Sequence, residues 1–527
     1  MSEEDVSRQL LGAAALVSLT IAIGVAAAQE APRRRGTRPQ TPPPAAPAKP
    51  ETKAEPTKEP PLAETTHTVM IGGRRVDYKA TAGRLELRNE ENKTTAHVFF
   101  VAYTRTGAEE AGKRPLTFAF NGGPGSSAVW LQMGALGPRR VGSGDVGSHT
   151  APPYPLVDNE HSILDITDLV FIDPVSTGYS RPAEGEKAAQ FHGVQQDLDS
   201  VSEFIRMYTT RFNRWASPKF LIGESYGTTR ASGLSGLLQD RHGLYLNGIA
   251  LVSAVLNFET ISFAEGNDLP YSLFLPSYTA AAWYHKKLPA ELQGDLDKAL
   301  AEARKFAAGE YTLALMRGEK LSTAERKEVV RKIVRYTGLA EEFIERSDLR
   351  VPIFRFTKEL LRKDKKTVGR YDSRMTGWDV DPVSERMDYD PSYTIVQGAY
   401  TAAFNQYVRN ELKYDSEMPY EILTSKVRPW DYGMAGQNRY VNVAETLRQA
   451  MIKNHDLRVF VANGYYDLAT PFFATEYTFD HMALAPPLAG HVTLAYYEGG
   501  HMMYLHPPAL TKLKKDLSAF IEAAVKR

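Results

Sequence analysis

The 527-residue chain contains no cysteine and carries no net charge, because 63 acidic residues balance 63 basic ones. The absence of cysteine excludes disulfides, thiolate zinc sites and a cysteine nucleophile. The absence of excess positive charge excludes the basic surface that is typical of nucleic-acid-binding proteins. Neither H-E-x-x-H nor G-x-x-x-x-G-K-[ST] occurs in the sequence, so no motif indicates a metal or an organic cofactor, and we expect none.

What is present is typical of a globular protein. Hydrophobic residues make up 43% of the chain and charged residues 24%, which is close to the average and allows most of the chain to bury a core. At roughly 100–200 residues per domain, the length fits one large domain with insertions or two to three smaller domains.

Residues 1–28 are predicted to direct export. Residues 10–28 form an uncharged apolar run that ends in three alanines, which is the pattern of a signal-peptidase site. The run is also long enough to cross a bilayer core of about 30 Å. The charged residues before it are mostly acidic, unlike those of a typical signal peptide. A cleaved signal, an uncleaved membrane anchor and a buried core helix are the alternatives. The first two lead to a secreted or periplasmic protein, and an uncleaved anchor tethers it to a membrane.

Residues 29–65 have a different composition. They are rich in proline, alanine and charge and have almost no large apolar side chain. Such a segment cannot bury enough surface to offset its ordering entropy, so we predict a disordered, extended linker. It serves either as a spacer that holds the following domain away from a membrane or wall, or as a dispensable leader.

Short apolar strands alternate with helices from residue 66 onward. Residues 67–88 predict antiparallel hairpins, and residues 194–212 have apolar positions at helical spacing. Continuous apolar strands separated by helices are typical of a mainly parallel sheet that is covered on both faces. We therefore predict an α/β fold with an antiparallel start. The expected strands are 97–103, 116–120, 169–172, 220–222, 249–256, 457–462 and 492–497.

The strand pattern is interrupted over residues 263–441. This stretch is charged and helical, with a capping box at Ser322 and Glu325 that opens the segment ERKEVVRKIVRY. We predict a helical insertion that forms a lid over the substrate pocket. It divides the α/β core into a first part at 66–262 and a second part at 442–527.

The segment GESYG at residues 223–227 matches the G-x-S-x-G pattern of a nucleophile elbow. It follows the apolar strand KFLI and precedes an expected helix, which is the context that the elbow requires. The strained turn holds the serine hydroxyl out at the sheet edge, and glycines are needed because side chains would clash in so tight a turn. Ser225 is therefore the candidate nucleophile, and a purely structural turn is the alternative.

A serine hydroxyl needs a base to accept its proton, and a carboxylate to orient that base. In α/β folds that carry a nucleophile elbow, the partners follow the serine in the order Asp, His, and each comes after a later strand. Asp467 directly follows the strand 457–462, and His501 directly follows the strand 492–497. These two residues are the candidates. Their rivals are His506 for the base and Asp456 and Asp480 for the carboxylate.

Backbone N–H groups are expected to stabilise the oxyanion of the transition state. In this fold one N–H belongs to the residue after the nucleophile, here Tyr226, and another to a glycine-rich loop after an earlier strand. The segment NGGPG at residues 121–125 follows the strand 116–120 and fits that loop. An ordinary Gly-Pro turn is the alternative.

Six segments form a set with a fixed order along the chain: FNGGPGSS (120–127), LGP (136–138), DPVSTGYS (173–180), GESYG (223–227), NGYYDLATP (463–471) and GGHM (499–502). Together they resemble the serine carboxypeptidase family, a branch of the α/β-hydrolase fold, over nearly all of the chain from residue 67. The resemblance implies a triad of Ser225, Asp467 and His501 and an oxyanion hole made by the N–H groups of Gly123 and Tyr226. It also implies release of C-terminal residues from peptides, or acyl transfer in some members.

The resemblance further assigns contacts with the terminal carboxylate of the peptide. Asn121, Gly122 and Glu224 match the family's residues for this contact, but Ala135 stands where the family has a second glutamate. Two carboxyl groups that share a proton explain an acidic pH optimum. Without the second group, we expect Glu224 to ionise more easily and to repel a substrate carboxylate, which puts strict C-terminal specificity in question.

We therefore expect an exported serine peptidase of the carboxypeptidase type, which acts on peptides through an acyl-enzyme. Two alternatives stay open. One is an esterase or acyltransferase on the same triad, which Ala135 favours, and the other is a tethered binding protein with an inactive triad. No nucleic-acid partner is expected, and the sequence does not indicate an oligomeric state.

Overall fold

The computed structural model describes residues 61–526, apart from 108–111, 143, 145, 147–150 and 434–438. The predicted signal peptide or anchor at residues 1–28 lies outside the described residues, as does the predicted linker at 29–65 up to residue 60. The last residues assigned to the linker belong instead to a strand that begins at Ala63. Across the described ranges, no helix combines the length and the apolar character that crossing a membrane requires.

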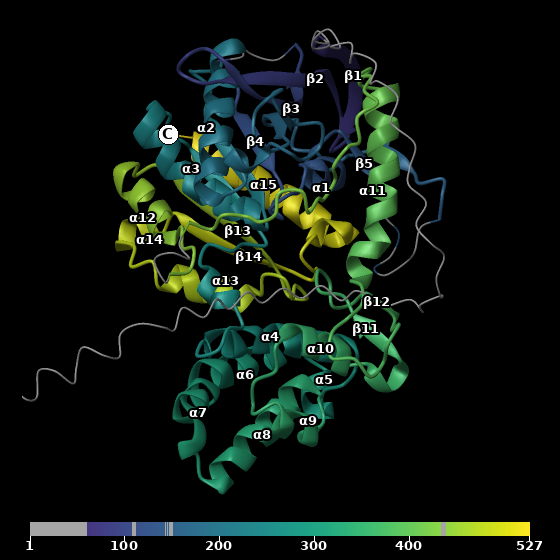
Figure 1. The fold of residues 1–527 in the computed structure, drawn as a ribbon, viewed down its shortest axis with the longest axis vertical. Coiled ribbons are helices and arrows are strands. Elements are labelled where there is room, and N and C mark those ends of the chain that lie inside the picture. Colours follow the sequence, from purple (N-terminus) through teal and green to yellow (C-terminus); the bar gives the residue numbers. More distant parts are fainter. Residues whose placement is uncertain are drawn as a thin grey trace, which may run out of the picture. The chain divides into compact units, whose positions relative to one another are not determined.

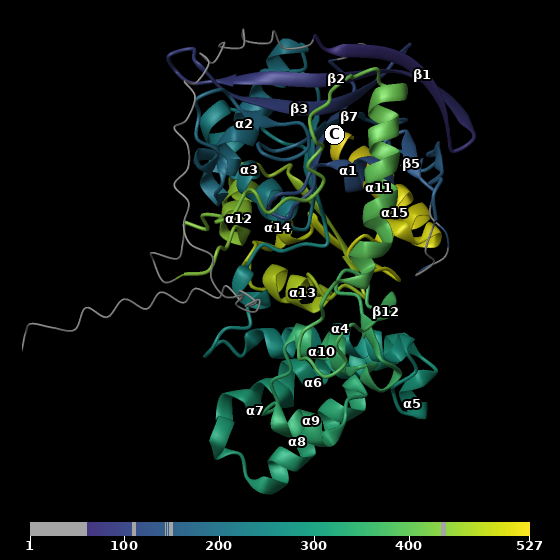
Figure 2. The same cartoon turned by 45° about the vertical axis from the view of Figure 1, so that its right-hand side comes forward.

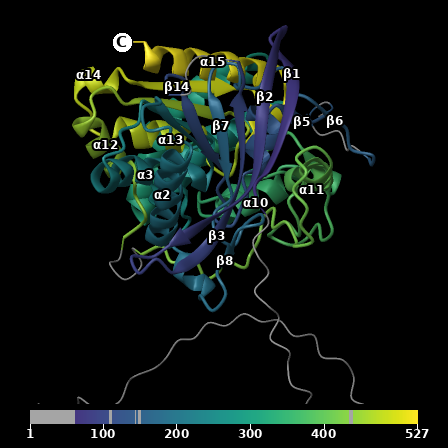
Figure 3. The same ribbon diagram turned by 90° about the horizontal axis from the view of Figure 1, so that it is seen from above.

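Ten strands form one central sheet (Figures 1 and 3), antiparallel at its start and parallel over the rest, as predicted. β1, β2, β3 and β7 pair antiparallel in that order, and the strands from β7 to β14 run parallel to their neighbours. In spatial order the strands are β1 (Ala63–Ile71), β2 (Arg74–Arg88), β3 (Thr94–Arg105), β7 (Asp168–Ile172), β4 (Leu116–Phe120), β9 (Lys219–Glu224), β10 (Gly248–Val252), β13 (Arg458–Gly464) and β14 (Val492–Tyr497), with β8 (Arg181–Pro182) paired to β3.

Helices cover both faces of this sheet, as Figure 3 shows for α2 and α3 against α11. Along β9, Leu221 belongs to the core on one face and Ile222 to the core on the other, because successive side chains of a strand point to opposite faces. One face is covered by α2 (Val194–Arg211), α3 (Tyr226–His242) and α12 (Ala444–Lys453), and the other by α1 (Val129–Leu131), α11 (Pro391–Asn410) and α15 (Pro507–Val525).

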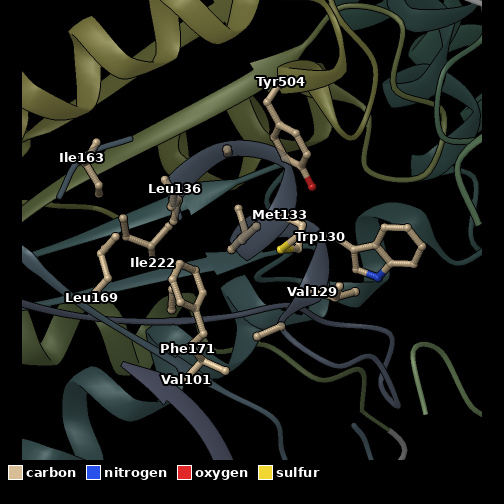
Figure 4. Close-up of a cluster of buried hydrophobic side chains, with 14 of the residues drawn as sticks. Val101, Val129, Trp130, Met133, Leu136, Ile163, Leu169, Phe171, Ile222 and Tyr504 are labelled. Atoms are coloured by element: carbon tan, nitrogen blue, oxygen red, sulfur yellow. The ribbon is translucent and has the colours of Figure 1, made fainter. Parts of the chain in front are cut away.

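Figure 4 shows part of the core on the α1 face, where Met133 and Leu136 lie beside Phe171 and Ile222 of the sheet. All four side chains are buried, and burial of a large apolar side chain contributes about 1.5–3 kcal/mol. The chain after α1 forms a single π-helical turn, Gln132–Leu136, which includes Ala135. The Ala135 side chain belongs to the apolar core on this face of the sheet.

A second group of helices lies between β10 and β13 in the chain and occupies the lower part of Figures 1 and 2. Among the described residues of this stretch, none adds a strand to the central sheet. The group has its own apolar core, which includes Tyr278, Ile333 and Phe356. It comprises α4 (Leu269–Tyr284), α5 (Ala290–Gln293), α6 (Leu296–Phe306), α7 (Thr312–Arg317), α8 (Thr323–Thr337), α9 (Glu341–Arg346) and α10 (Ile353–Glu359).

The predicted capping box at the start of α8 is present. The Ser322 hydroxyl accepts a hydrogen bond from the Glu325 backbone N–H at 3.3 Å, and the Glu325 carboxylate accepts one from the Ser322 N–H at 2.9 Å. These bonds satisfy two N–H groups that the first turn of a helix leaves unpaired.

Shorter elements complete the described fold. Two antiparallel pairs were not predicted, β5–β6 and β11–β12, because strands of three residues are too short for a pattern. α4 packs against α13, which begins just after Asp467. The bounds are β5 (Arg139–Val141), β6 (Leu156–Asp158), β11 (Lys366–Val368), β12 (Thr376–Trp378), α13 (Phe472–Asp480) and α14 (Pro486–Ala489).

One strand is shorter than predicted. The apolar run 249–256 forms a strand only up to Val252, because Ser253 has a φ of 54°, which ends the extended conformation. The turn places the Ser253 hydroxyl where it donates to the backbone oxygen of His501 at 2.7 Å.

Leu221 gives a test of the sheet core. The Leu221→Ala variant should lose about 2–5 kcal/mol of unfolding free energy, since its side chain is 0% exposed and its removal leaves a cavity. Leu313, 60% exposed on α7, is the matched control, and Leu313→Ala should change stability by less than about 0.5 kcal/mol. Urea unfolding followed by fluorescence measures both. Equal losses in the two variants would contradict the two-layer core.

Candidate active site

Ser225 lies in the turn between β9 and α3, as predicted. Its φ of 61° and ψ of −130° are outside the regions that a residue with a side chain ordinarily adopts. The turn is held by hydrogen bonds from the Ser225 N–H to the Val252 oxygen at 3.0 Å and from the Thr228 N–H to the Ser225 oxygen at 2.8 Å. A Cβ atom at Gly223 would lie 2.1 Å from the Gly227 oxygen, so this position accepts only glycine.

Asp467 and His501 are hydrogen-bonded, with 2.8 Å between Oδ2 of Asp467 and Nδ1 of His501. The Asp467 side chain is 0% exposed. Its other oxygen accepts the backbone N–H groups of Ala469 and Thr470 at 2.7 and 3.0 Å, and the Thr470 hydroxyl donates to Oδ2 at 2.7 Å. Four donors therefore fix the carboxylate, which in turn orients the imidazole.

The backbone of His501 is held from two directions. Its N–H donates to the Tyr371 oxygen at 2.5 Å, and its oxygen accepts from the Ser253 hydroxyl at 2.7 Å. The Tyr371 ring also lies beside the imidazole, with 5.1 Å between ring centroids. The rival His506 lies instead at the N-terminus of α15.

An open pocket, with about 510 Å³ of space that includes solvent at its mouth, brings together several of the predicted residues. Ser225 and His501 both line it, and Asp467 lies behind His501. Among the hydrogen bonds of the described residues, none joins the Ser225 hydroxyl to the imidazole, so the two groups share the cavity without contact through such a bond. The lining residues are Asn121, Gly122, Gly123, Ser126, Trp130, Glu224, Ser225, Arg370, Tyr371, Tyr393, Leu423, His501 and Met502.

The NGGPG loop packs backbone to backbone against the elbow. A Cβ atom at Gly122 would lie 2.3 Å from the N atom of Tyr226, which explains the glycine. Gly123 has a φ of 103° and faces the cavity. The loop thus brings the N–H groups of Gly123 and Tyr226, the two predicted oxyanion donors, to the same part of the molecule.

A buried ion pair supports this loop and was not predicted. Arg230 of α3 donates to Asp197 of α2 through Nε at 2.7 Å and Nη2 at 3.1 Å, and through Nη1 to the Asn121 backbone oxygen at 2.6 Å. Both side chains are almost fully buried. The one available signal was a lone arginine among the small and apolar residues that follow the elbow.

The described residues contain no cluster of three or more histidine, cysteine, aspartate or glutamate side chains that could hold a metal.

Residues 72–491 match the family described as serine carboxypeptidase. The chain belongs to the serine carboxypeptidase family. Over 156 residues it is 30% identical to the pheromone-processing carboxypeptidase KEX1 of Saccharomyces cerevisiae. The matched segment covers 28% of this chain and 20% of that protein. The chain thus matches about a fifth of the length of this curated relative.

A solved structure supports the fold. The chain is similar to the prohormone-processing carboxypeptidase KEX1(delta)p from Saccharomyces cerevisiae, with a TM-score of 0.52 and 16% identity over 84% of this chain and 91% of that one. A thermophilic esterase from Thermogutta terrifontis matches with a TM-score of 0.34 and 9% identity over 84% of this chain and 100% of that one. The predicted α/β-hydrolase fold is confirmed by the first likeness and by the mainly parallel sheet.

Glu224 lies in the cavity wall next to Ser225, and its side chain is buried. Its side chain is 3% exposed, and this burial raises the pKa of Glu224 to about 7, although His501 and the hydroxyl of Tyr504 act in the opposite direction. The Tyr504 hydroxyl donates to Oε2 of Glu224 at 2.7 Å. That Glu224 ionises more easily than it would beside a second carboxyl group stays a prediction, but burial alone keeps its pKa above the ordinary range.

Gly122 tests the contact between the loop and the elbow. The Gly122→Ala variant should lose at least about 100-fold in kcat/KM, because an added methyl group would displace the Tyr226 N–H from the oxyanion position. Gly309 has open space around its Cβ position, so Gly309→Ala is the matched control and should keep its activity. Ester hydrolysis measures the effect, with circular dichroism to confirm folding. Full activity of Gly122→Ala would contradict the proposed oxyanion geometry.

Proposed function

We propose that this protein is an exported serine carboxypeptidase that hydrolyses peptides through an acyl-enzyme. The observation that carries the proposal is the buried hydrogen bond between Asp467 and His501, whose imidazole shares a cavity with the strained Ser225. Membership of the serine carboxypeptidase family supports peptides as the substrate class.

In the proposed reaction the Ser225 hydroxyl attacks the carbonyl carbon of the scissile peptide bond, and Nε2 of His501 accepts its proton. The N–H groups of Gly123 and Tyr226 stabilise the oxyanion that forms. His501 then gives the proton to the leaving amine, and the peptide bond breaks. Water attacks the acyl-enzyme in the second half, with His501 again as base, and Ser225 regains its proton. Asp467 orients the imidazole and stabilises its charged form.

The substrate end and the setting of the enzyme complete the proposal. Asn121, Gly122 and Glu224 line the cavity and bind the terminal carboxylate of the peptide. The helices of residues 263–441 form a lid over the substrate pocket. In the sequence they lie between the two parts of the core, 66–262 and 442–527. Residues 1–28 direct secretion or transfer to the periplasm, or remain as a membrane tether.

An esterase or acyltransferase on the same triad is the second candidate. It is favoured by Ala135, which lies 2% exposed in the apolar core and supplies no second carboxyl group. Cleavage of acyl esters by a protein that leaves blocked dipeptides intact would establish this alternative.

A fluorophosphonate probe tests the nucleophile. The wild-type protein should be labelled at Ser225, and Ser225→Ala should show no label and lose at least about 1,000-fold in kcat, because the variant lacks the hydroxyl that attacks the substrate. Ser235 lies in the same helix and bonds locally to the Ser232 oxygen, so Ser235→Ala is a matched control that should keep the label. Mass spectrometry identifies the site. An unlabelled wild-type protein would indicate an inactive binding protein.

The pKa of about 7 for Glu224 predicts how substrate preference changes with pH. Below pH 7 the Glu224 carboxyl group is mainly neutral and allows a substrate carboxylate to lie beside it. Above pH 7 it is ionised and repels that carboxylate. The ratio of kcat/KM for a free-acid peptide to that for its C-terminal amide should therefore fall about tenfold or more as pH rises through 7. The ratio cancels the titration of the triad itself.

The Glu224→Gln variant provides the control for this pH profile. It keeps a neutral side chain of the same size, so its ratio should stay level across pH 5–9. A wild-type ratio that does not change with pH would show that Glu224 has no contact with the substrate end.

A further inference from the structure

Arg370 is a cation in the cavity wall, and it has no carboxylate partner among the residues that the structure describes. It follows β11, is half-buried and lines the cavity together with Ser225 and His501. In the described part of the chain, no aspartate or glutamate side chain lies within ion-pair distance of its guanidinium. By contrast, Arg374 in the same segment is paired with Asp372 at 2.7 Å. The charge of Arg370 is thus available to a ligand.

The position of Arg370 is fixed by its backbone. Its N–H donates to Oδ1 of Asp390 at 3.1 Å, and its oxygen accepts from the Leu468 N–H at 3.0 Å, next to Asp467. The following residue, Tyr371, accepts the N–H of His501. The Arg370 guanidinium lies over the Tyr371 ring, 4.9 Å from its centroid. The backbone bonds and the Tyr371 ring therefore hold Arg370 beside the segments that carry Asp467 and His501.

The other described residues around the cavity supply little negative charge that could pair with Arg370 in place of a ligand. Burial keeps Glu224 largely neutral below pH 7, and the oxygens of Asp467 accept hydrogen bonds from His501 and from three further donors. Rings such as those of Trp130 and Tyr393 make up much of the remaining wall. A partly desolvated guanidinium in such a setting is best satisfied by an anion with two oxygens in one plane.

We propose that Arg370 is a specificity-determining residue that binds a carboxylate of the peptide substrate. The inference rests on the proposed peptidase function and adds to it a positive contact supplied by the segment between β11 and β12. The carboxylate is either that of the peptide C-terminus or that of an acidic side chain next to the scissile bond. Both present the same planar pair of oxygens to the guanidinium.

Binding to the Ser225→Ala protein measures this contact whether or not the wild type turns over. N-blocked dipeptides are titrated calorimetrically into Ser225→Ala alone and combined with Arg370→Gln or Arg370→Lys. One pair of ligands differs only in a free acid or an amide at the C-terminus. A second pair, both amides, differs only in Glu or Gln beside the scissile bond. Lys363→Gln, which removes an exposed charge in the insertion, is the matched control.

Loss of one charge-assisted contact should weaken binding of the carboxylate ligand about 10- to 100-fold in Arg370→Gln. The neutral partner of the pair should change less than about twofold, and so should every ligand with Lys363→Gln. Arg370→Lys should recover part of the loss, since it keeps the charge without the planar fork. A loss confined to the first pair identifies the terminal carboxylate, and a loss confined to the second identifies an acidic side chain.

Equal affinities for the members of both pairs, with and without Arg370, would overturn the inference. Hydrolysis of the same peptides by the wild-type protein is measured in parallel. An enzyme that cleaves peptides but shows no dependence on Arg370 keeps the proposed function and loses the anion contact. The reverse outcome is carboxylate-selective binding that needs Arg370, together with a wild-type protein that neither cleaves peptides nor reacts with the phosphonate. It keeps the anion contact and loses the proposed function.

Discussion

The hydrogen bond between Asp467 and His501 requires Oδ2 of one and Nδ1 of the other to stay 2.8 Å apart, and the sheet positions the two loops that carry these residues. The loops follow β13 and β14, which are parallel neighbours in register from Val459 with Val492 to Gly464 with Tyr497. Parallel strands end at the same edge, so a residue after one lies close to a residue after the next. Ser225 leaves the sheet at the same edge after β9, with one strand, β10, between it and β13. The relative placement of Ser225, His501 and Asp467 is thus a property of strand order.

Strand order alone does not hold the imidazole. His501 belongs to a short loop with glycines before it, and its backbone is fixed by groups from two other parts of the chain. Ser253, after β10, binds its oxygen, and Tyr371, from the segment between β11 and β12, binds its N–H. A Cβ atom at Gly500 would lie 2.3 Å from the Tyr371 oxygen, which explains why glycine precedes the histidine. The region between β10 and β13 is therefore part of the support for the base.

Much of the fold could be predicted from the sequence because its strands are short, continuous and apolar. β4 and β14 have the predicted bounds, and α2 begins at the predicted residue. The predicted end of β10 failed because a positive φ at Ser253 breaks a run that stays apolar to Leu256. The division into core and insertion at 263 and 441 stays a prediction, since residue composition marks it and no comparison tests it.

The candidate site divides in the same way. Ser225, Asp467 and His501 could be predicted because each directly follows a recognisable strand. Arg230, Tyr504 and Arg370 could not, because each reaches the site from a helix or loop whose position depends on tertiary packing. The direction of the Glu224 pKa also needed the structure, since its degree of burial is decided by side chains far away in sequence.

The bond between the His501 N–H and the Tyr371 oxygen has a consequence for biosynthesis. The strand that leads to Ser225 has been synthesised long before the ribosome adds His501, and the backbone of His501 is then held only if residue 371 is already in place. A nascent or nicked polypeptide with a misfolded middle segment would hold a serine but no aligned imidazole. Alignment of the His501 imidazole is in this way coupled to completion of the whole domain.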